Sequence, residues 1–335
     1  MASIFGDKDF ISRLPNDCLI SILSFLNPSS LDVIEYVNQK LRNLAIHKGW
    51  KRPKRAKNEI VIQQVQQRQV LLVTSQVNDY SLIWDPMIPM NFENKKSKFV
   101  YISGSLFNAI EEMSFKFAFQ KLKLMEVHLD NSFSRNLQTT FHGDLPSSLE
   151  LVRTTTSNTF NLIEFLIDTK IRTFSFYGAK TYEVSLFNED FVRKFSGAGN
   201  TRLAIYRYFK ESEYSWKPST NLLPVICRYT TLHLEHMIMI KAILEELIPM
   251  AFKLVEKDVS WYFTMDSQLD ENELANFNNG QFSMEKRTGC EVFAIKKKMC
   301  QKSCEITIGE NNLLIIKFYS NLNSDALNKN IRALM

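Results

Sequence analysis

Short strand-like segments recur along most of this chain, and their recurrence restricts the fold more than any other feature. They are FVYIS, LMEVHL, LELVRT, IRTFSFY, RLAIYRY, TLHLEH and SWYFT, beginning at Phe99, Leu124, Leu149, Ile171, Arg202, Thr231 and Ser260. Successive starts lie about 22 to 31 residues apart, an interval that fits one strand plus one helix. Helix-like stretches fill some of the intervals, for example residues 105–122 and 238–255. Because parallel neighbours need a crossover connection, repeated strand–helix units predict a parallel sheet.

A single strand–helix unit cannot bury its apolar face, so such units must stack into a curved α/β array. Two segments approximate a leucine-rich pattern, the first with Leu124, Val127, Leu129 and Asn131, the second with Ile171, Phe174 and Phe176 in place of leucines. The array therefore resembles leucine-rich repeats. The alternative is a doubly wound sheet, in which helices cover both faces.

The two ends of this region differ from its middle. EIVIQQV, QVLLVTS and YSLIW, within residues 59–84, read as short strands with polar breaks between them. VFAIKKK, CEITIGE and NLLIIKFYS, near the end of the chain, are strands joined by short polar turns. These last strands predict an antiparallel β cap, because the open end of a repeat array would expose apolar surface.

The composition is that of an ordinary globular protein, with 335 residues, 45% hydrophobic and 23% charged side chains. This length suggests about two domains. The 5 cysteines are scattered and odd in number, which fits a reducing compartment. Charged residues interrupt the first residues of the chain, and no apolar run reaches about 18 residues, so neither a signal peptide nor a membrane span is predicted. We expect a cytoplasmic or nuclear protein that makes no membrane contact.

Residues 11–46 predict a small bundle of three helices. Leu14-Pro15 and the capping residues Asn16 and Asp17 precede a first amphipathic helix with Leu19, Ile22, Leu23 and Leu26 at helical spacing. Residues 27–30 (NPSS) end that helix and begin a second one, with Leu31, Val33, Ile34 and Val37. A third helix carries Leu41, Leu44 and Ile46. A core this small leaves some apolar side chains exposed, and exposed apolar side chains of this kind usually contact a partner protein.

This segment resembles the F-box, the helical module by which substrate receptors attach to the Skp-family adaptor of cullin-RING ubiquitin ligases. Leu14-Pro15 corresponds to the Leu-Pro opening of the motif, and the apolar positions that follow match its spacing. The chain departs from the family at Asn38 and Leu41, where Cys or Ser and then an aromatic residue are common. The resemblance implies adaptor contacts at Leu14, Pro15, Leu19, Ile22, Leu23, Leu26, Leu31 and Val37. Some of these side chains must instead pack inside the helical bundle.

The run KGWKRPKRAK, residues 48–57, contains six basic residues and no acidic one, and Pro53 interrupts any helix there. We therefore expect an F-box domain at residues 10–47, a basic linker at residues 48–58 and an α/β substrate-recognition domain at residues 59–335. The fold class is α+β overall, with a three-helix F-box followed by a leucine-rich-repeat-like α/β domain and an antiparallel β cap. The layout resembles nematode-type F-box proteins with an F-box-associated domain.

Motifs that carry chemistry are missing from the sequence. It has no GxSxG nucleophile elbow, no GxGxxG or Walker phosphate loop and no HExxH zinc motif. His233 and His236 lie three apart, and on a strand such positions point to opposite faces, so they do not predict a metal site. We expect a protein that is not an enzyme and needs no cofactor.

The resemblance implies a substrate-recognition subunit of an SCF-type ubiquitin ligase, bound to a Skp-family adaptor and through it to a cullin scaffold. On a leucine-rich-like curve, outward strand residues line the concave face, and these are the candidate target contacts: His128, Asp130, Ser175, Tyr177, His233 and Glu235. Two alternatives remain. One is a non-enzymatic scaffold unrelated to ubiquitin ligation. The other is nucleic-acid binding through Lys51, Arg52, Lys54 and Arg55, although the basic run has no interleaved stacking residues.

Overall fold

The computed structural model describes residues 14–37, 39–45, 54–65, 68–74, 82–84, 106–179, 185–207, 215–266, 282–286, 292–297, 302–308 and 312–320. The chain forms two compact units, one of residues 1–122 and 135–146, the other of residues 123–134 and 147–335. The strand expected at Phe99 lies outside the described residues. None of the helices in the described part of the chain has both the length and the apolar character that a membrane span requires.

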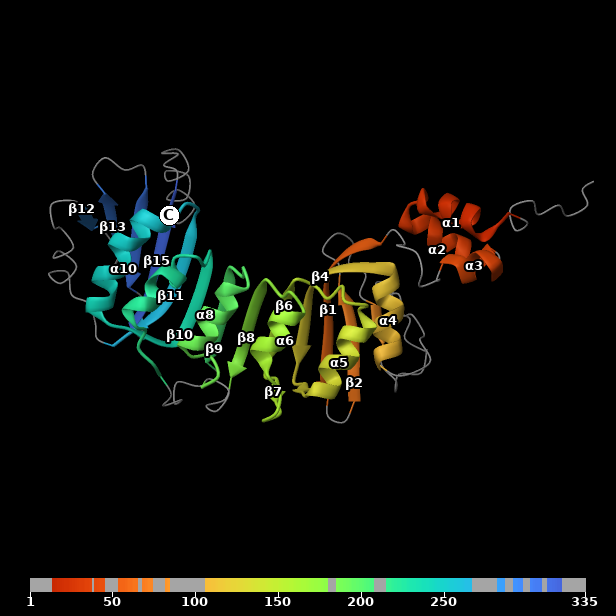
Figure 1. Ribbon diagram of the computed structural model, residues 1–335, viewed down its shortest axis with the longest axis horizontal. Coiled ribbons are helices and arrows are strands. Elements are labelled where there is room, and N and C mark those ends of the chain that lie inside the picture. Colours follow the sequence, from red (N-terminus) through yellow and green to blue (C-terminus); the bar gives the residue numbers. More distant parts are fainter. Residues whose placement is uncertain are drawn as a thin grey trace, which may run out of the picture. The chain divides into compact units, whose positions relative to one another are not determined.

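The first unit begins with the three predicted helices, α1 (Asn16–Ser24), α2 (Pro28–Val37) and α3 (Gln39–Ala45), drawn in red tones in Figure 1. The side chain of Asn27 caps α2 by accepting a hydrogen bond of 2.8 Å from the backbone N–H of Ser30. Five leucines form the buried core of this small bundle: Leu19, Leu23, Leu31, Leu41 and Leu44. The predicted helices therefore supply this core, but three of the apolar positions predicted on them are exposed: Ile22, Val33 and Val37.

The first unit also contains antiparallel strands. The strand β1 (Arg55–Val65) pairs with β2 (Arg68–Thr74), which pairs with β3 (Leu82–Trp84). Ile60 and Ile62, two residues apart on β1, are fully buried, as expected for the core face of a strand. Because β1 begins at Arg55, the last residues of the expected basic linker 48–58 are part of a strand.

The helix predicted at residues 105–122 ends earlier than expected. Helix α4 (Leu106–Lys116) is followed directly by the strand β4 (Phe117–Met125). From Lys121 onward lysines alternate with buried leucines, because Leu122 and Leu124 are buried while Lys121 and Lys123 are half-buried. An alternation with a period of two is typical of a strand, and these residues form a strand although the segment also has a helical pattern of apolar residues. Helix α5 (Asn131–Thr140) follows.

The second unit is built on parallel strands that lie side by side in the order in which they occur in the chain. They are β6 (Ser148–Val152), β8 (Thr173–Ala179), β9 (Arg202–Arg207), β10 (Thr231–Met239) and β11 (Val259–Met265). Each pairs in parallel with the next. The strands predicted at Leu149, Ile171, Arg202, Thr231 and Ser260 are therefore confirmed, with start positions within two residues.

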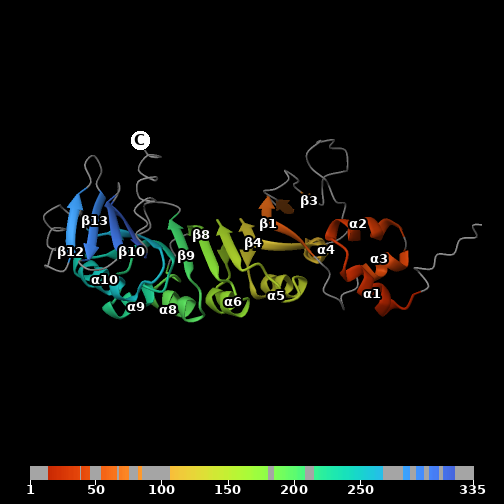
Figure 2. The same cartoon turned by 90° about the horizontal axis from the view of Figure 1, so that it is seen from above.

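The helices of the second unit cover one face of this sheet, as Figure 2 shows. They are α6 (Leu162–Asp168), α8 (Glu189–Gly197), the one-turn η1 (Thr220–Leu222) with α9 (Leu223–Ile226), and α10 (Lys241–Leu254). Crossovers between parallel strands are right-handed, so strands laid down in sequence order send every crossover helix to the same face. A doubly wound sheet needs a reversal of strand order, which these strands do not have, so that alternative is wrong.

Two inward-facing residues from each parallel strand form the core beneath these helices. Strand pairing aligns them in two rows, Leu149, Phe174, Leu203, Leu232 and Trp261, and Leu151, Phe176, Ile205, Leu234 and Phe263. All of them are at most 1% exposed. Burying side chains of this size contributes about 1.5–3 kcal/mol each, so these rows contribute strongly to the stability of the unit.

The sheet of the second unit ends in antiparallel strands. Beyond β11 lie β15 (Leu313–Tyr319), β14 (Ser303–Ile308), β13 (Val292–Lys297) and β12 (Phe282–Lys286), each antiparallel to its neighbour. The unit therefore has a mixed nine-stranded sheet. A separate pair of short parallel strands, β5 (His128–Leu129) and β7 (Thr155–Thr156), lies outside it.

The end of α6 is a Schellman motif with a residue other than glycine at its left-handed position. Lys170 has φ +56°. Its N–H donates to the carbonyl of Ile167, and the N–H of Ile171 donates to the carbonyl of Leu166, both at 3.0 Å. After α8 the left-handed position is occupied by a glycine instead, Gly199, which has φ +81°. Lysine therefore carries a backbone strain at residue 170 that glycine avoids at residue 199.

We expect Lys170→Gly to raise the free energy of unfolding by about 1 kcal/mol, because glycine adopts positive φ without the steric cost of a Cβ. The matched change Gly199→Ala is expected to lower it by a similar amount, about 1 kcal/mol. Urea unfolding followed by circular dichroism measures both. If the two substitutions shift stability in the same direction, backbone strain is not the determining factor.

Candidate functional site

The surface of the helical bundle carries large apolar side chains that the bundle does not bury. Ile22 is 47% exposed, Phe25 89%, Val33 63% and Val37 70%. Val33 and Val37 are four residues apart and so share one face of α2. Exposed apolar residues grouped on so small a module are typical of a surface that binds another protein.

The residues expected to contact an adaptor divide into two groups. Leu19, Leu23 and Leu31 lie in the core of the bundle, and Leu14 and Leu26 are partly buried against it. Pro15, Ile22 and Val37 are exposed. Phe25 and Val33 belong with the exposed group but were not among the expected contacts, although they lie on the amphipathic segments that the sequence analysis identified. Periodicity finds the helices, but it does not tell a leucine that packs inside from an apolar residue that faces outward.

A second candidate site lies on the face of the second unit's sheet opposite to its helices. Four ring-bearing residues from successive strands lie side by side there: Tyr177 on β8, Tyr206 on β9, His233 on β10 and Tyr262 on β11. The ring centroids of neighbours are 4.3, 4.2 and 5.0 Å apart. We call these four residues the tyrosine row.

The geometry of the tyrosine row follows from strand spacing. Neighbouring strands lie about 4.8 Å apart, which is close to the distance at which aromatic rings stack. Tyr177 and Tyr206 are paired in register and stack with an interplanar angle of 6°, and His233 and Tyr262 are paired in register with an angle of 13°. Rings stacked in this way stand upright on the sheet, so their edges and polar groups point outward.

Glu235 extends the tyrosine row with a carboxylate. It lies two residues beyond His233 on β10, and the Nε2 atom of His233 donates a hydrogen bond of 3.1 Å to its Oε1. The side chain of Glu235 is 32% exposed, whereas that of His233 is 14% exposed. Burial, the neighbouring Tyr177 hydroxyl and the Glu235 carboxylate raise the pKa of Tyr206 far above its usual value of 10.0. The site therefore disfavours negative charge.

The structure brings four of the six expected target contacts to this one face. Ser175, Tyr177, His233 and Glu235 lie on the same side of β8 and β10, at half-buried positions. His128 lies on the separate strand β5, where its Nδ1 is 2.9 Å from the hydroxyl of Thr155. Asp130 accepts a hydrogen bond of 2.7 Å from the backbone N–H of Phe133 and thereby caps α5. His128 and Asp130 are therefore not part of the tyrosine row.

Tyr206 and Tyr262 were missed by the sequence analysis. The segments that begin at Ile171 and Arg202 carry these tyrosines at their seventh and fifth residues, so aligning the segments on their first residues does not bring the four rings together. Strand register does so, because it pairs Tyr206 with Tyr177 and Tyr262 with His233.

A bulge follows Glu235 on β10, and a neighbouring segment holds it. The pairing of β10 with β11 shifts between Leu234 and Ile238. Trp216 bridges this point, since its N–H donates to the carbonyl of His236 and its carbonyl accepts from Ile238. The carbonyl of Phe187 accepts hydrogen bonds from the Trp216 indole at 3.1 Å and from the Nε2 of His236 at 2.8 Å. These contacts fix the end of β10 and therefore the position of Glu235.

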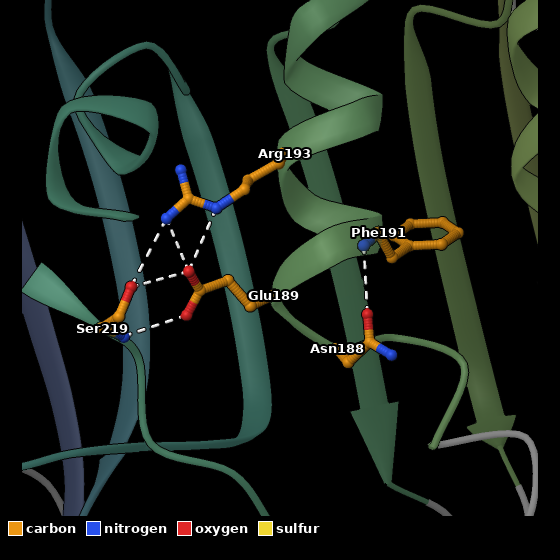
Figure 3. Close-up of polar contacts among 5 residues, drawn as sticks. All are labelled: Asn188, Glu189, Phe191, Arg193 and Ser219. Atoms are coloured by element: carbon orange, nitrogen blue, oxygen red, sulfur yellow. Dashed lines mark hydrogen bonds and ion pairs between the residues drawn. The ribbon is translucent and has the colours of Figure 1, made fainter. Parts of the chain in front are cut away.

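The segment that carries Trp216 is itself fixed to α8 by a carboxylate, drawn in Figure 3. Glu189 accepts hydrogen bonds from the Ser219 backbone N–H at 3.0 Å, from the Ser219 hydroxyl at 2.7 Å and from the Arg193 guanidinium at 3.0 Å. Burial raises the pKa of Glu189, but the hydrogen bonds from Ser219 and the interaction with Arg193 outweigh it and hold the pKa below its usual value of 4.5. Asn188 caps the same helix through the N–H of Phe191 at 3.1 Å.

Metal ligands do not cluster in the described part of the chain, where no group of three or more His, Cys, Asp or Glu side chains is placed to hold an ion. His233 and His236 point to opposite faces of β10, because His233 stacks with Tyr262 on one side and His236 contacts Phe187 on the other. The buried thiols of Cys227 and Cys304 have pKa values raised by burial, which makes them poor nucleophiles.

Comparison with known families identifies the helical bundle. Residues 11–51 match the sequence profile of the F-box domain. The N-terminal module is an F-box domain. In general, an F-box domain implies binding to a Skp-type adaptor and a substrate-adaptor role in an SCF ubiquitin ligase, a role that is typically non-catalytic.

The F-box match covers residues 11–51 of the 335-residue chain. A search of curated proteins gives no significant match. One solved structure that aligns is that of YdhD from Bacillus subtilis, provisionally described as a sporulation-specific glycosylase. It covers 69% of this chain and 82% of its own, at 9% identity and a TM-score of 0.16, so it supports no argument about the fold. The likeness of residues 59–335 to leucine-rich repeats and to nematode-type F-box-associated domains stays a prediction.

We expect Glu189→Gln to lower the free energy of unfolding by about 1 kcal/mol at neutral pH, because the charged hydrogen bonds with Ser219 and Arg193 become neutral ones. Since the pKa of Glu189 is lowered in the folded chain, its contribution is complete above the usual pKa and is lost as the pH falls through the lower folded value. The difference between wild type and variant should therefore shrink on acidification. Urea unfolding across this pH range measures it.

Asp190→Asn is the matched control, because Asp190 lies on the same turn of α8 and its ion pair with Lys194 is exposed. We expect a smaller loss of stability from this change. An equal loss in the two variants, with the same pH dependence, would mean that general helix electrostatics and not the Ser219 contact sets the effect.

Proposed function

We propose that this chain is the substrate-recognition subunit of a cullin-RING ubiquitin ligase of the SCF type. Its F-box domain binds a Skp-family adaptor and, through it, the cullin scaffold. Its second unit binds a target protein, so the chain itself does no bond chemistry. It acts by raising the local concentration of the target near the conjugating enzyme and by orienting it.

The observation that supports this proposal most directly is the F-box match at residues 11–51 together with the exposed apolar side chains on the same helices. Ile22, Phe25, Val33 and Val37, with Pro15, are the adaptor contacts in this proposal, because they have apolar surface to bury against a partner. Leu19, Leu23 and Leu31 have an indirect role, since they shape the bundle that presents those residues.

The proposed target-binding surface is the open face of the sheet in the second unit. Ser175, Tyr177, His233 and Glu235 remain contacts in this proposal, and Tyr206 and Tyr262 are added to them. Tyrosine is enriched in protein interfaces because it offers a large, rigid and amphipathic contact area. The proposed location is the cytoplasm or the nucleus, where SCF-type ligases act.

The decisive experiment is co-elution with the adaptor on size-exclusion chromatography, using the full chain and the double variant Ile22→Asp, Val37→Asp. Both residues are exposed, so the variant is expected to fold, which circular dichroism and thermal unfolding will check. A charge buried against the adaptor costs several kcal/mol, so we expect affinity to fall by at least about a hundredfold.

Asn43→Asp is the matched control, because it places the same charge at an exposed polar position of α3. We expect it to bind the adaptor like wild type. If wild type fails to bind, or if the double variant binds as well as wild type, the proposed role in a ubiquitin ligase is refuted and the scaffold alternative gains support.

A further inference from the structure

We propose that the tyrosine row binds an uncharged segment of the target protein through an aromatic side chain, whose ring face lies across the outward ring edges of the row. This inference rests on the proposed function, because it names the chemistry that the open face of the second unit recognises. The target ring lies over His233, which is shorter than the tyrosines on either side of it, and the adjoining target residues lie along Tyr206 and Tyr262.

The first argument is that the ring faces of the tyrosine row are already in use. The ring centroids of neighbours are only 4.2 to 5.0 Å apart. At the two ends of the row, aliphatic residues of the next strands are paired in register with the rings, Val152 with Tyr177 and Ile315 with Tyr262. Ligands that stack on a ring face, such as nucleobases, or that lie over one, such as cations, compete with these neighbours. The row therefore offers ring edges to a ligand.

The second argument is the charge distribution of an aromatic ring. The face of a ring is negative and its edge is positive, so an edge attracts the face of another ring in the T-shaped arrangement. The stacked rings present a line of such edges, with the tyrosine hydroxyls beside them. Each hydroxyl both donates and accepts hydrogen bonds, which suits the backbone groups of an extended segment. The row crosses three strand spacings, about 14 Å, which is the length of about four extended residues.

The third argument is that the charges of the open face balance one another. Among the described outward residues of β6, β8, β9, β10, β11 and β15, two are acidic and two are basic: Glu150, Glu235, Arg202 and Lys317. Lys123 of β4 forms an ion pair of 2.8 Å with Glu150, and Glu305 of β14 lies in register with Lys317. The other two charges have opposite signs. A ligand without charge therefore complements this face.

Burial adds to this preference for an uncharged ligand. The side chain of His233 is 14% exposed, and burial is the largest cause of the raised pKa of Tyr206. Burial disfavours a charge of either sign, so it opposes basic and acidic target side chains alike. An aromatic ring has no such cost, and rings that are already stacked lose little conformational freedom when it binds.

The test uses the full chain with ¹³C-labelled tyrosine rings, observed by NMR, with the signals assigned by replacing each tyrosine of the row with phenylalanine. The probe is the peptide acetyl-Gly-Val-Phe-Val-Gly-amide, and three counterparts carry cyclohexylalanine, arginine or glutamate at the central position. We expect saturable shifts of the Tyr206 and Tyr262 signals with the phenylalanine peptide. The cyclohexylalanine peptide, which has a similar side-chain size but no aromatic charge distribution, should bind about fivefold more weakly. Both charged peptides should bind at least about tenfold more weakly.

Tyr206→Leu removes one ring edge and its hydroxyl but keeps an apolar side chain, and we expect it to weaken binding of the phenylalanine peptide about fivefold. Tyr319→Leu is the matched control, because it makes the same change on the open face of β15, four residues or about 13 Å from Ile315. It should bind the peptide like wild type. Circular dichroism checks that both variants fold, and the peptide series on wild type decides the matter if Tyr206→Leu does not.

The inference is overturned if the phenylalanine and cyclohexylalanine peptides bind alike, or if either charged peptide binds as tightly as the phenylalanine peptide. It is also overturned if folded Tyr206→Leu binds like wild type, or if no saturable shift appears at millimolar peptide.

The adaptor co-elution described above separates this inference from the proposed function. If wild type co-elutes with the adaptor but shows no peptide shifts, the recognition site is wrong and the proposed function stands. If the peptide shifts appear as expected but wild type does not bind the adaptor, the site stands and the role in a ubiquitin ligase falls.

Discussion

The second unit depends on the two inward rows of large apolar side chains that its parallel strands place beneath one layer of helices. Phe174, Phe176, Trp261 and Phe263 are fully buried there. Phe174 contacts Phe191 and Phe195 of α8, and Trp261 contacts Phe318 of β15. The crossover helices that the structure describes all lie on that side, so none of them covers the opposite face of the same strands. The core therefore determines where the tyrosine row lies, and the row is as rigid as the strands below it.

The positions of the parallel strands β6, β8, β9, β10 and β11 followed from the sequence, because each carries alternating apolar residues at a regular interval, whereas β12 was not predicted. The boundary between α4 and β4 did not follow, because the phenylalanines from Phe115 to Phe119 fit a helix and a strand equally well. Asp130 was interpreted as a surface strand residue, whereas it caps α5. An aspartate followed by Asn131 and Ser132 is also a helix-start signal, and local propensity alone does not decide between the two interpretations.

The sequence predicted what kind of site each candidate site is, but not which residues form it. The amphipathic helices were identified, yet Leu19 and Leu23 pack inside while Ile22 and Phe25 face outward, a division that depends on how three helices pack and not on any one of them. In the same way, Tyr177 and His233 were named singly. Their relation to Tyr206 and Tyr262 depends on strand register, which pairs residues about 29 positions apart and leaves no local trace in the sequence.

The parallel strands of the second unit lie in the order of the sequence, and their crossover connections are all right-handed. A sheet of this kind can be lengthened by adding strand–helix segments. Inserting or deleting one whole strand–helix segment would keep the handedness of each remaining crossover and the register of each remaining pair. It would change only how many side chains stand in line on the open face. The width of this surface can thus change in evolution by duplication of strand–helix segments, in steps of one strand spacing. Such a change keeps the packing of the existing core.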